Sequence, residues 1–238
     1  ANVGTTFSSQ LIAFDIGQWA GLPMLMGFLL LVATQRDHLR QWGQVILGFG
    51  MLFLGLFLME KAVEPLKKLP DVAAWMHGLE SPLRGALVGA GATVLLQSSS
   101  ATVGMAVVLA GQKLLTLPAG VALMMGAELG TCADTLVASI GRSRAAVKTG
   151  LFHFGFNLLS IVVGLSLIHP FTGLAEWLSA GATPARQLAN AHVLFNALGV
   201  LLMAPLVPWV AASLERWLPE QASSHAEAAP VADVHPTS

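Results

Sequence analysis

Charge and cysteine are both scarce in this 238-residue sequence. Only 11% of the residues are charged, against roughly a quarter in soluble domains, and 55% are hydrophobic. This composition excludes an ordinary soluble domain and indicates a membrane protein. The formal net charge of −1 gives no basic excess that would point to nucleic-acid binding. The single cysteine, Cys132, cannot form a disulfide within the chain, so packing must hold the fold together.

The two ends of the sequence differ from its apolar middle. The first residues, ANVGTTFSS, contain neither a Met nor a basic leader, and we expect them to be the inside of a motif whose start is missing. The last residues, 219–238, are rich in Ala, Ser, Pro and His and show no periodicity. We expect this segment to be a disordered tail.

The lengths of the apolar runs indicate how the chain uses a bilayer. A helix needs about 20 apolar residues to cross a ~30 Å hydrocarbon core, whereas runs of about 10 to 14 are typical of re-entrant or broken segments. Val147–Ile168 and Leu188–Val210 are long enough, and we predict two crossings there. Ile16–Thr34 and Gln44–Met59 are shorter. We predict a tilted span for the first and a partly interfacial helix for the second.

The middle of the chain consists of apolar runs that are too short to cross unaided. The runs are Gly85–Leu96, Ala101–Gly111, Leu114–Met125 and Leu129–Ile140, separated by QSSS, GQK and GAE. Backbone that leaves the helix at membrane depth must be buried in protein or line a wet cavity. We therefore predict helical hairpins that enter and return, with the QSSS run facing a cavity.

Two short patterns occur twice. A-x-x-G-T begins at Ala1 and at Ala127, and H-x-x-F-N begins at His153 and at His192. Transporters are often built from repeats, with a binding site where paired short segments meet. In each H-x-x-F-N pattern the His and the Asn lie four residues apart on one helix face. We interpret them as interhelical hydrogen-bonding groups rather than transport groups.

The QSSS run has the chemistry of an anion site. Serine hydroxyls and a Gln amide can donate, and a helix starting near Ala101 would present unpaired N–H groups to a phosphate-like ligand. No Lys or Arg lies inside these short runs, so the positive charge must come from elsewhere. Glu128 and Asp134 offer oxygen ligands for a small cation. Co-transport of a cation and an oxyanion is the prediction that follows.

Four motifs give the chain a resemblance to a known family. They are QSSSAT at 97–102, GAELGT at 126–131, ANVGTT at 1–6 and RQLANAHVLFN at 186–196. On these motifs the chain resembles the bacterial sodium/phosphate cotransporter family, which is related to the type II sodium-phosphate cotransporters of animals. The resemblance covers roughly residues 1–219. It implies an all-α polytopic membrane protein with inverted repeats, re-entrant hairpins and broken helices.

The resemblance also implies a division of the chain and a set of site residues. Residues 1–80 would be the remainder of a first repeat with connecting helices, 81–218 the second repeat, and 219–238 the tail. The implied phosphate site is Gln97, Ser98, Ser99, Ser100, Thr102, Asn2, Thr5 and Thr6, and the implied Na⁺ ligands are Gln97, Ser99, Glu128 and Thr131. Glu128 stands where the family has Asn, and Cys132 where it has Thr.

The function implied is sodium-coupled transport of inorganic phosphate by alternating access. The protein would be multi-pass in the plasma (inner) membrane, with Na⁺ as coupling ion, no cofactor, the lipid bilayer as partner and no nucleic acid. The sequence does not decide whether the protein forms a homo-oligomer. Arg142, Arg144 and Lys148 precede the first long span, which predicts a cytoplasmic loop there and a cytoplasmic C-terminal tail.

Two alternatives belong to other classes of protein. In an intramembrane serine hydrolase, a serine of the QSSS run would be the nucleophile and His153 or His192 the general base. The sequence lacks a nucleophile elbow, and three consecutive serines resemble a coordination shell more than one positioned nucleophile. The other alternative is a non-transporting scaffold or a channel subunit, in which the QSSS serines would only kink a helix.

Overall fold

The computed structural model describes residues 2–14 and 17–219, and all the regular structure in these ranges is helical. The α-helices are α1 (Asn2–Ile12), α2 (Gly21–Ala33), α3 (Asp37–Val63), α4 (Pro70–Gly78), α5 (Pro82–Leu96), α6 (Ser99–Gly111), α7 (Leu117–Ser139), α8 (Arg144–Ser166), α9 (Ile168–Leu178), α10 (Pro184–Met203) and α11 (Val207–Trp217). The predicted all-α class is confirmed. The predicted tail lies outside the described residues from position 220 onward.

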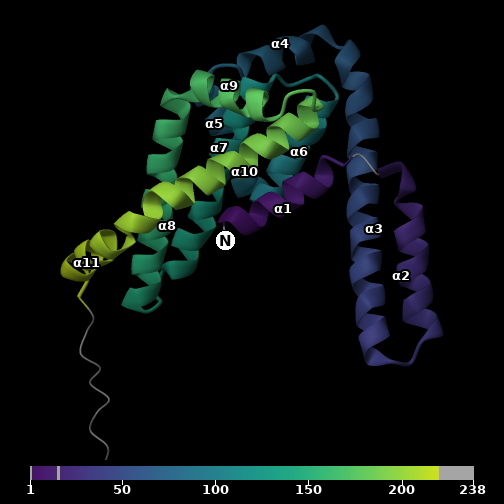
Figure 1. Ribbon diagram of the computed structural model, residues 1–238, viewed down its shortest axis with the longest axis horizontal. Coiled ribbons are helices and arrows are strands. Elements are labelled where there is room, and N and C mark those ends of the chain that lie inside the picture. Colours follow the sequence, from purple (N-terminus) through teal and green to yellow (C-terminus); the bar gives the residue numbers. More distant parts are fainter. Residues whose placement is uncertain (1, 15–16, 220–238) are drawn as a thin grey trace, which may run out of the picture.

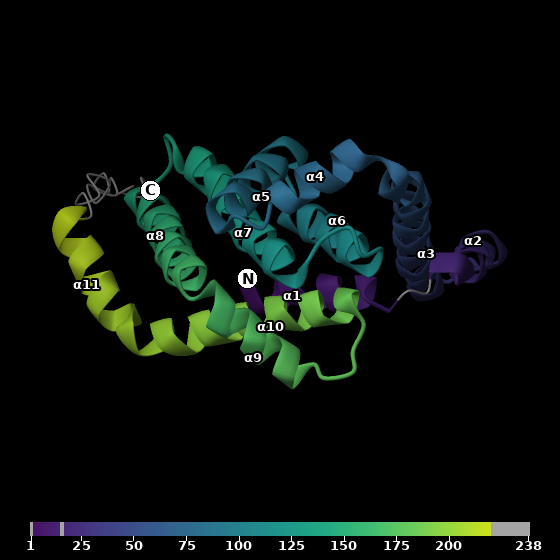
Figure 2. The same ribbon diagram turned by 90° about the horizontal axis from the view of Figure 1, so that it is seen from above.

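The helices form a central body with a hairpin beside it. In Figures 1 and 2, α1, α5, α6, α7 and α10 lie together at the centre, with α8 and α11 on one side and the α2–α3 hairpin on the other. The central helices carry most of the buried apolar side chains, including Met124, Met125 and Leu188. Of the two arms of the QSSS run, α6 therefore belongs to the buried core, whereas α5 has Ala86 as its buried apolar side chain and exposes Leu83, Leu87 and Leu95.

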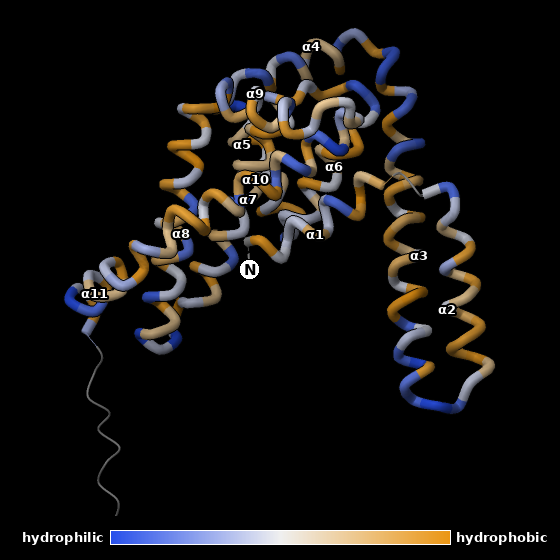
Figure 3. Tube along the Cα trace, viewed as in Figure 1, coloured by the Kyte–Doolittle hydropathy of each residue, from blue (hydrophilic) through white to orange (hydrophobic). Residues whose placement is uncertain are grey.

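Four stretches of the described chain are long and apolar enough to cross a membrane. They are Asp37–Lys68, Leu117–Ser139, Arg144–Ser166 and Pro184–Trp217. The third overlaps the predicted crossing Val147–Ile168, and the fourth contains the predicted crossing Leu188–Val210. Helices α5 and α6 have only 15 and 13 residues, which fits the predicted short arms, while re-entry into a bilayer stays a prediction. Figure 3 shows hydrophobic residues along the α2–α3 hairpin and hydrophilic ones at its turn.

The prediction of two short segments around the GAE sequence is wrong. Helix α7 runs without a break for 23 residues from Leu117 to Ser139, and Glu128 is inside it. The backbone does not have to leave the helix at Glu128, because the carboxylate accepts hydrogen bonds from side chains of α10. A buried charge with partners is tolerated where an isolated one is not.

The length of the helix at Gln44–Met59 favours a membrane span over the predicted partly interfacial helix. This segment is the middle of α3, a 27-residue helix that with the following turn meets the criterion for a membrane span. The apolar run alone underestimates the length of the helix, because α3 continues through charged residues at both ends. The long side chains of such residues can reach the polar boundary of a bilayer. In the segment predicted as a tilted span, helix α2 occupies 13 residues, and the span stays a prediction.

Glycines bring α5 and α7 into backbone contact. A Cβ on Gly126 would collide with the carbonyl oxygen of Ala86, and one on Gly89 would collide with that of Leu123. Gly91, in contrast, faces open space. Small residues at helix contacts permit such close approach. The α5–α7 contact fixes α5, and thereby the place where α5 ends at the QSSS run.

Candidate functional site

The chain breaks between α5 and α6, at the QSSS run. Helix α5 ends at Leu96, and Gln97 adopts the left-handed conformation with φ 51° and ψ 32°. Ser98 is extended and caps α6, since its Oγ accepts a hydrogen bond from the N–H of Ala101 at 3.2 Å. A left-handed residue followed by a serine N-cap is a standard way to stop one helix and start another. The predicted helix break is therefore present in the structure.

Two buried threonines tie the arms of the break together. Thr93 Oγ1 of α5 donates to Thr102 Oγ1 of α6 at 2.9 Å, and both residues are 0% exposed. Thr102 Oγ1 also lies 3.2 Å from the carbonyl oxygen of Ser98. Above this buried pair, Gln97 is exposed and Ser98 is half-buried. Thr102, a predicted substrate residue, thus holds the two helices of the break together through buried hydrogen bonds. The side chain of Gln97 is exposed and can contact a ligand.

Helix α1 lies against the start of α6. Ser8 Oγ of α1 is 3.4 Å from Ser100 Oγ, the side-chain contact that joins α1 to the QSSS run. Of the residues predicted from α1, Thr6 is buried and donates to the carbonyl of Val3, and Thr5 is half-buried. Asn2 begins α1, but its side chain lies outside the described residues. The structure thus brings α1 to the run, through a serine that was not predicted.

Glu128 makes its contacts on a different side of the site. The residue is 5% exposed, and its Oε1 lies 2.9 Å from His192 Nε2 and 3.2 Å from Asn196 Nδ2. On the other side of the imidazole, His192 Nδ1 is 3.0 Å from Ser9 Oγ of α1. Thr131, another predicted Na⁺ ligand, donates to the carbonyl of Ala127 on its own helix. No hydrogen bond in the described chain joins Glu128 or Thr131 to the QSSS run.

The two repeated sequence patterns make the same contact in space. His192 Nδ1 meets Ser9 at 3.0 Å, and His153 Nδ1 meets Thr135 Oγ1 at 3.2 Å. Ser9 and Thr135 each lie eight residues after the Ala that starts an A-x-x-G-T pattern. Each H-x-x-F-N helix therefore packs on an A-x-x-G-T helix, α10 on α1 and α8 on α7. The interhelical hydrogen bonds predicted for both histidines are present.

The same two patterns contain the signal for the part of the site that the sequence prediction missed. In α10, His192 and Asn196 are four residues apart, so both reach the same neighbouring helix. That neighbour carries Glu128 in the second residue of its A-x-x-G-T pattern. From the sequence, the carboxylate of Glu128 could have been paired with the His and Asn of an H-x-x-F-N pattern. The structure was needed to show which of the two H-x-x-F-N patterns makes this contact.

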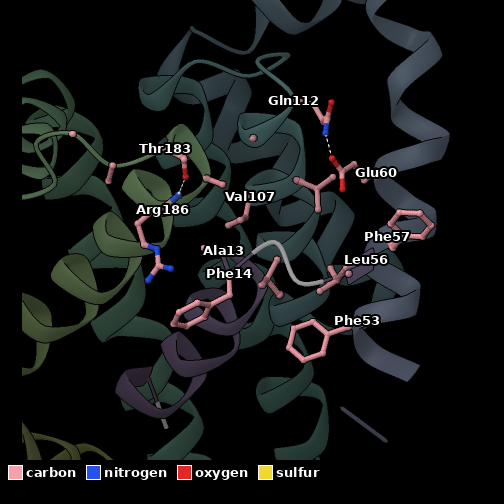
Figure 4. Close-up of a pocket in the computed structure, with 17 residues that line it drawn as sticks. Ala13, Phe14, Phe53, Leu56, Phe57, Glu60, Val107, Gln112, Thr183 and Arg186 are labelled. Carbon is pink, nitrogen blue, oxygen red and sulfur yellow. Dashed lines mark hydrogen bonds between the residues drawn. The ribbon is translucent and has the colours of Figure 1, made fainter. Parts of the chain in front are cut away.

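A cavity of about 540 Å³ lies at the other end of α6, between α1, α3, α6 and the start of α10. Figure 4 shows its aromatic wall, Phe53 and Phe57, and its polar rim, where Gln112 donates to Glu60. Arg186 stacks on the Phe14 ring at 4.2 Å. The cavity reaches Gly111, which is ~18 Å along α6 from Ser99 at the helical rise, and no residue of the QSSS run lines it.

The family of the chain follows from comparison with known proteins. Residues 1–61 and 70–204 match the Na⁺/Pi-cotransporter family. The chain belongs to this family. Because the family consists of transporters rather than enzymes, membership favours transport over the serine hydrolase alternative. No solved structure matches the chain.

Relatives of the chain occur in bacteria and animals. YqeW of Bacillus subtilis is 32% identical over 208 residues, covering 86% of the chain and 66% of YqeW. The putative inorganic phosphate export protein YjbB of Escherichia coli K12 is 27% identical over 209 residues, covering 87% of the chain and 38% of YjbB. Human sodium-dependent phosphate transport protein 2B is 29% identical over 148 residues, covering 60% of the chain and 19% of that protein. The chain thus spans about two thirds of YqeW and less than half of the other two.

Proposed function

We propose that the protein carries inorganic phosphate across a membrane together with Na⁺, and that the phosphate binds at the break between α5 and α6. The observation that carries the proposal is the interrupted helix itself. The N–H groups in the first turn of a helix have no intrahelical partner, and the helix dipole favours an anion there. Here that first turn begins with Ser99 and Ser100, whose hydroxyls can donate as well.

The charge at the break requires a cation to accompany phosphate. Between Leu96 and Gly111 there is no Lys or Arg, and Arg84 lies at the far end of α5. Placing an anion in low-dielectric surroundings costs free energy when no opposite charge is near. Na⁺ beside the phosphate would supply it. We propose Gln97, Ser99 and Thr131 as oxygen ligands for this ion, and Asn2, Thr5 and Thr6 as further residues of the phosphate site.

The relatives' names support phosphate as the transported ion. YjbB is named for phosphate export, and the human relative for sodium-dependent phosphate transport. Both names give phosphate as the substrate, and only the name of YjbB gives a direction. We propose Na⁺ coupling for this chain because the break itself lacks a fixed cation. The transport experiment below also measures whether phosphate moves inward or outward.

The proposed orientation places the loop between α7 and α8 and the C-terminal end in the cytoplasm, at a plasma (inner) membrane. Lys148 forms an ion pair with Glu215 of α11, and Arg144 Nη1 donates to the carbonyl of Pro219 at 2.7 Å. These contacts put the basic loop and the end of α11 on the same side of the molecule. An excess of Lys and Arg is typical of cytoplasmic loops.

Flux of radiolabelled phosphate in proteoliposomes tests the proposal. With purified protein in the vesicles, a Na⁺ gradient should drive phosphate accumulation, and a choline gradient of equal ionic strength should not. Ser99→Ala should lower the Na⁺-driven rate by about ten-fold or more if the hydroxyl binds the transported ions. Phosphate movement that ignores Na⁺ would reject the coupling, and an unchanged rate in Ser99→Ala would favour a scaffold role for the run.

A further inference from the structure

The aromatic cavity, which is the space of about 540 Å³ between α1, α3, α6 and the start of α10, lies outside the proposed phosphate site. Its wall on α3 consists of Phe53, Leu56, Phe57 and Glu60. These residues come from successive turns of α3 and share one face of it, since side chains three or four residues apart lie one above the other. Phe53 and Glu60 are ~10 Å apart along the axis at the helical rise. The cavity therefore passes from an aromatic part to a charged rim.

The charged rim lies near the ends of two candidate membrane spans. The span Asp37–Lys68 contains Glu60 as the first of several charged residues with which it ends, and the span Pro184–Trp217 contains Arg186 in its first turn. Charged side chains near the ends of spans reach the polar boundary of a bilayer, while the apolar stretch between them lies at the depth of the acyl chains. The cavity thus has the same polar and apolar division as a phospholipid.

Arg186 gives the rim a cation with free donors. It is the one Lys or Arg among the described residues that line the cavity. Its guanidinium lies 4.2 Å from the centroid of the Phe14 ring (Figure 4), and no ion pair within residues 2–14 and 17–219 includes it. Stacking on a ring face leaves the N–H groups in the guanidinium plane available, and this planar fork matches two oxygens of a phosphate group.

The lining favours a phosphodiester with an attached acyl chain over free phosphate. Apolar residues of α1 and α6, among them Ile12 and Val107, complete the wall opposite α3. Inorganic phosphate would leave water for this apolar lining with one guanidinium beside it, and the carboxylate of Glu60 shares the rim, so its binding would be costly. A phospholipid phosphate carries a single charge that one Arg186 can offset, and its acyl chain would bury apolar surface against the aromatic wall.

We propose that the aromatic cavity binds one phospholipid, with its phosphate on Arg186 and an acyl chain along Phe53 and Phe57. Basic pockets between membrane-spanning helices bind lipid head groups in the same way. The lipid would connect α3 of the hairpin with α10 of the central body, in addition to the hydrogen bond between Gln112 and Glu60. The site is independent of the proposed phosphate transport, because it shares no residue with the QSSS run.

Native mass spectrometry of the purified, delipidated protein tests the site by titration with phosphatidylglycerol. The wild type should bind a first lipid more tightly than later ones. Arg186→Ala should weaken binding of the first lipid by about ten-fold or more, because it removes the charge-assisted contact to the phosphate. Val108→Trp should weaken it similarly while keeping Arg186, because Val108 of α6 lines the cavity and a larger side chain there would fill it.

The matched controls are Arg84→Ala and Val137→Trp. Both residues are exposed, and neither lines the cavity, so both variants should bind the first lipid as the wild type does. A wild type without a tighter first lipid, or an unchanged affinity in either Arg186→Ala or Val108→Trp, would overturn the proposal. Displacement of the lipid by inorganic phosphate, but not by chloride at equal ionic strength, would instead show a site for free phosphate and also overturn it. If Val108→Trp fails to fold, the contrast between Arg186→Ala and Arg84→Ala decides.

Discussion

Replacing Gln97 with glycine is expected to abolish most phosphate transport while leaving the protein as stable as the wild type, or more stable. Gln97 holds φ 51°, a conformation that costs a non-glycine residue about 1 kcal/mol and costs glycine almost nothing. If Gln97 served only to stop α5, glycine would do so better. If its amide binds the transported ions, Gln97→Gly should lower the transport rate by about ten-fold or more. Thermal unfolding and phosphate flux on the same preparation separate the two roles.

The chain offers a matched control for this substitution. Lys113, with φ 58°, is the other non-glycine residue with positive φ in the described chain, and it follows the far end of α6. Lys113→Gly should relieve the same kind of strain and leave phosphate transport at the wild-type rate. Full transport by Gln97→Gly would show that this side chain does not bind the ions.

Replacing Gly126 with alanine is expected to have the largest effect on stability. The added Cβ would collide with the carbonyl oxygen of Ala86. This oxygen belongs to the backbone of α5, so no side-chain rotation can relieve the collision. Overpacking of this kind costs about 1 to 3 kcal/mol, and contact with backbone favours the upper end. The melting temperature of Gly126→Ala should therefore fall. Transport should fall with it, because a displaced α5 moves the break.

Gly91→Ala is the control for Gly126→Ala. Gly91 lies in α5, and a Cβ there has no neighbour within 4 Å. Alanine is favoured over glycine inside a helix by about 1 kcal/mol, so Gly91→Ala should match or exceed the wild-type melting temperature. Equal melting temperatures for the two variants would contradict the close α5–α7 contact.

The sequence was sufficient for features that depend on neighbouring residues. The predicted helix break at the QSSS run is present, and α5 ends at Leu96 as predicted, while α6 begins at Ser99, two residues before the predicted start near Ala101. The motifs also predicted the family, which the comparison confirms.

Features that depend on distant residues could not be predicted. The break expected at Glu128 does not exist, because its partners His192 and Asn196 lie 64 and 68 residues further along the chain. A charge in an apolar run predicts either a break or a buried partner, and the sequence alone does not name the partner. For the same reason His192 was interpreted only as an interhelical hydrogen-bonding group, whereas it also orients the carboxylate.

Phosphate protection of a cysteine at the break tests the central claim most directly. Cys132 is fully buried, so a Ser100→Cys variant would carry one thiol accessible to a water-soluble thiol reagent. If the QSSS run is a water-accessible phosphate site, the reagent should label this thiol, and phosphate with Na⁺ should slow labelling by about ten-fold, whereas chloride should not. A thiol that is never labelled, or one labelled equally fast with and without phosphate, would contradict the account.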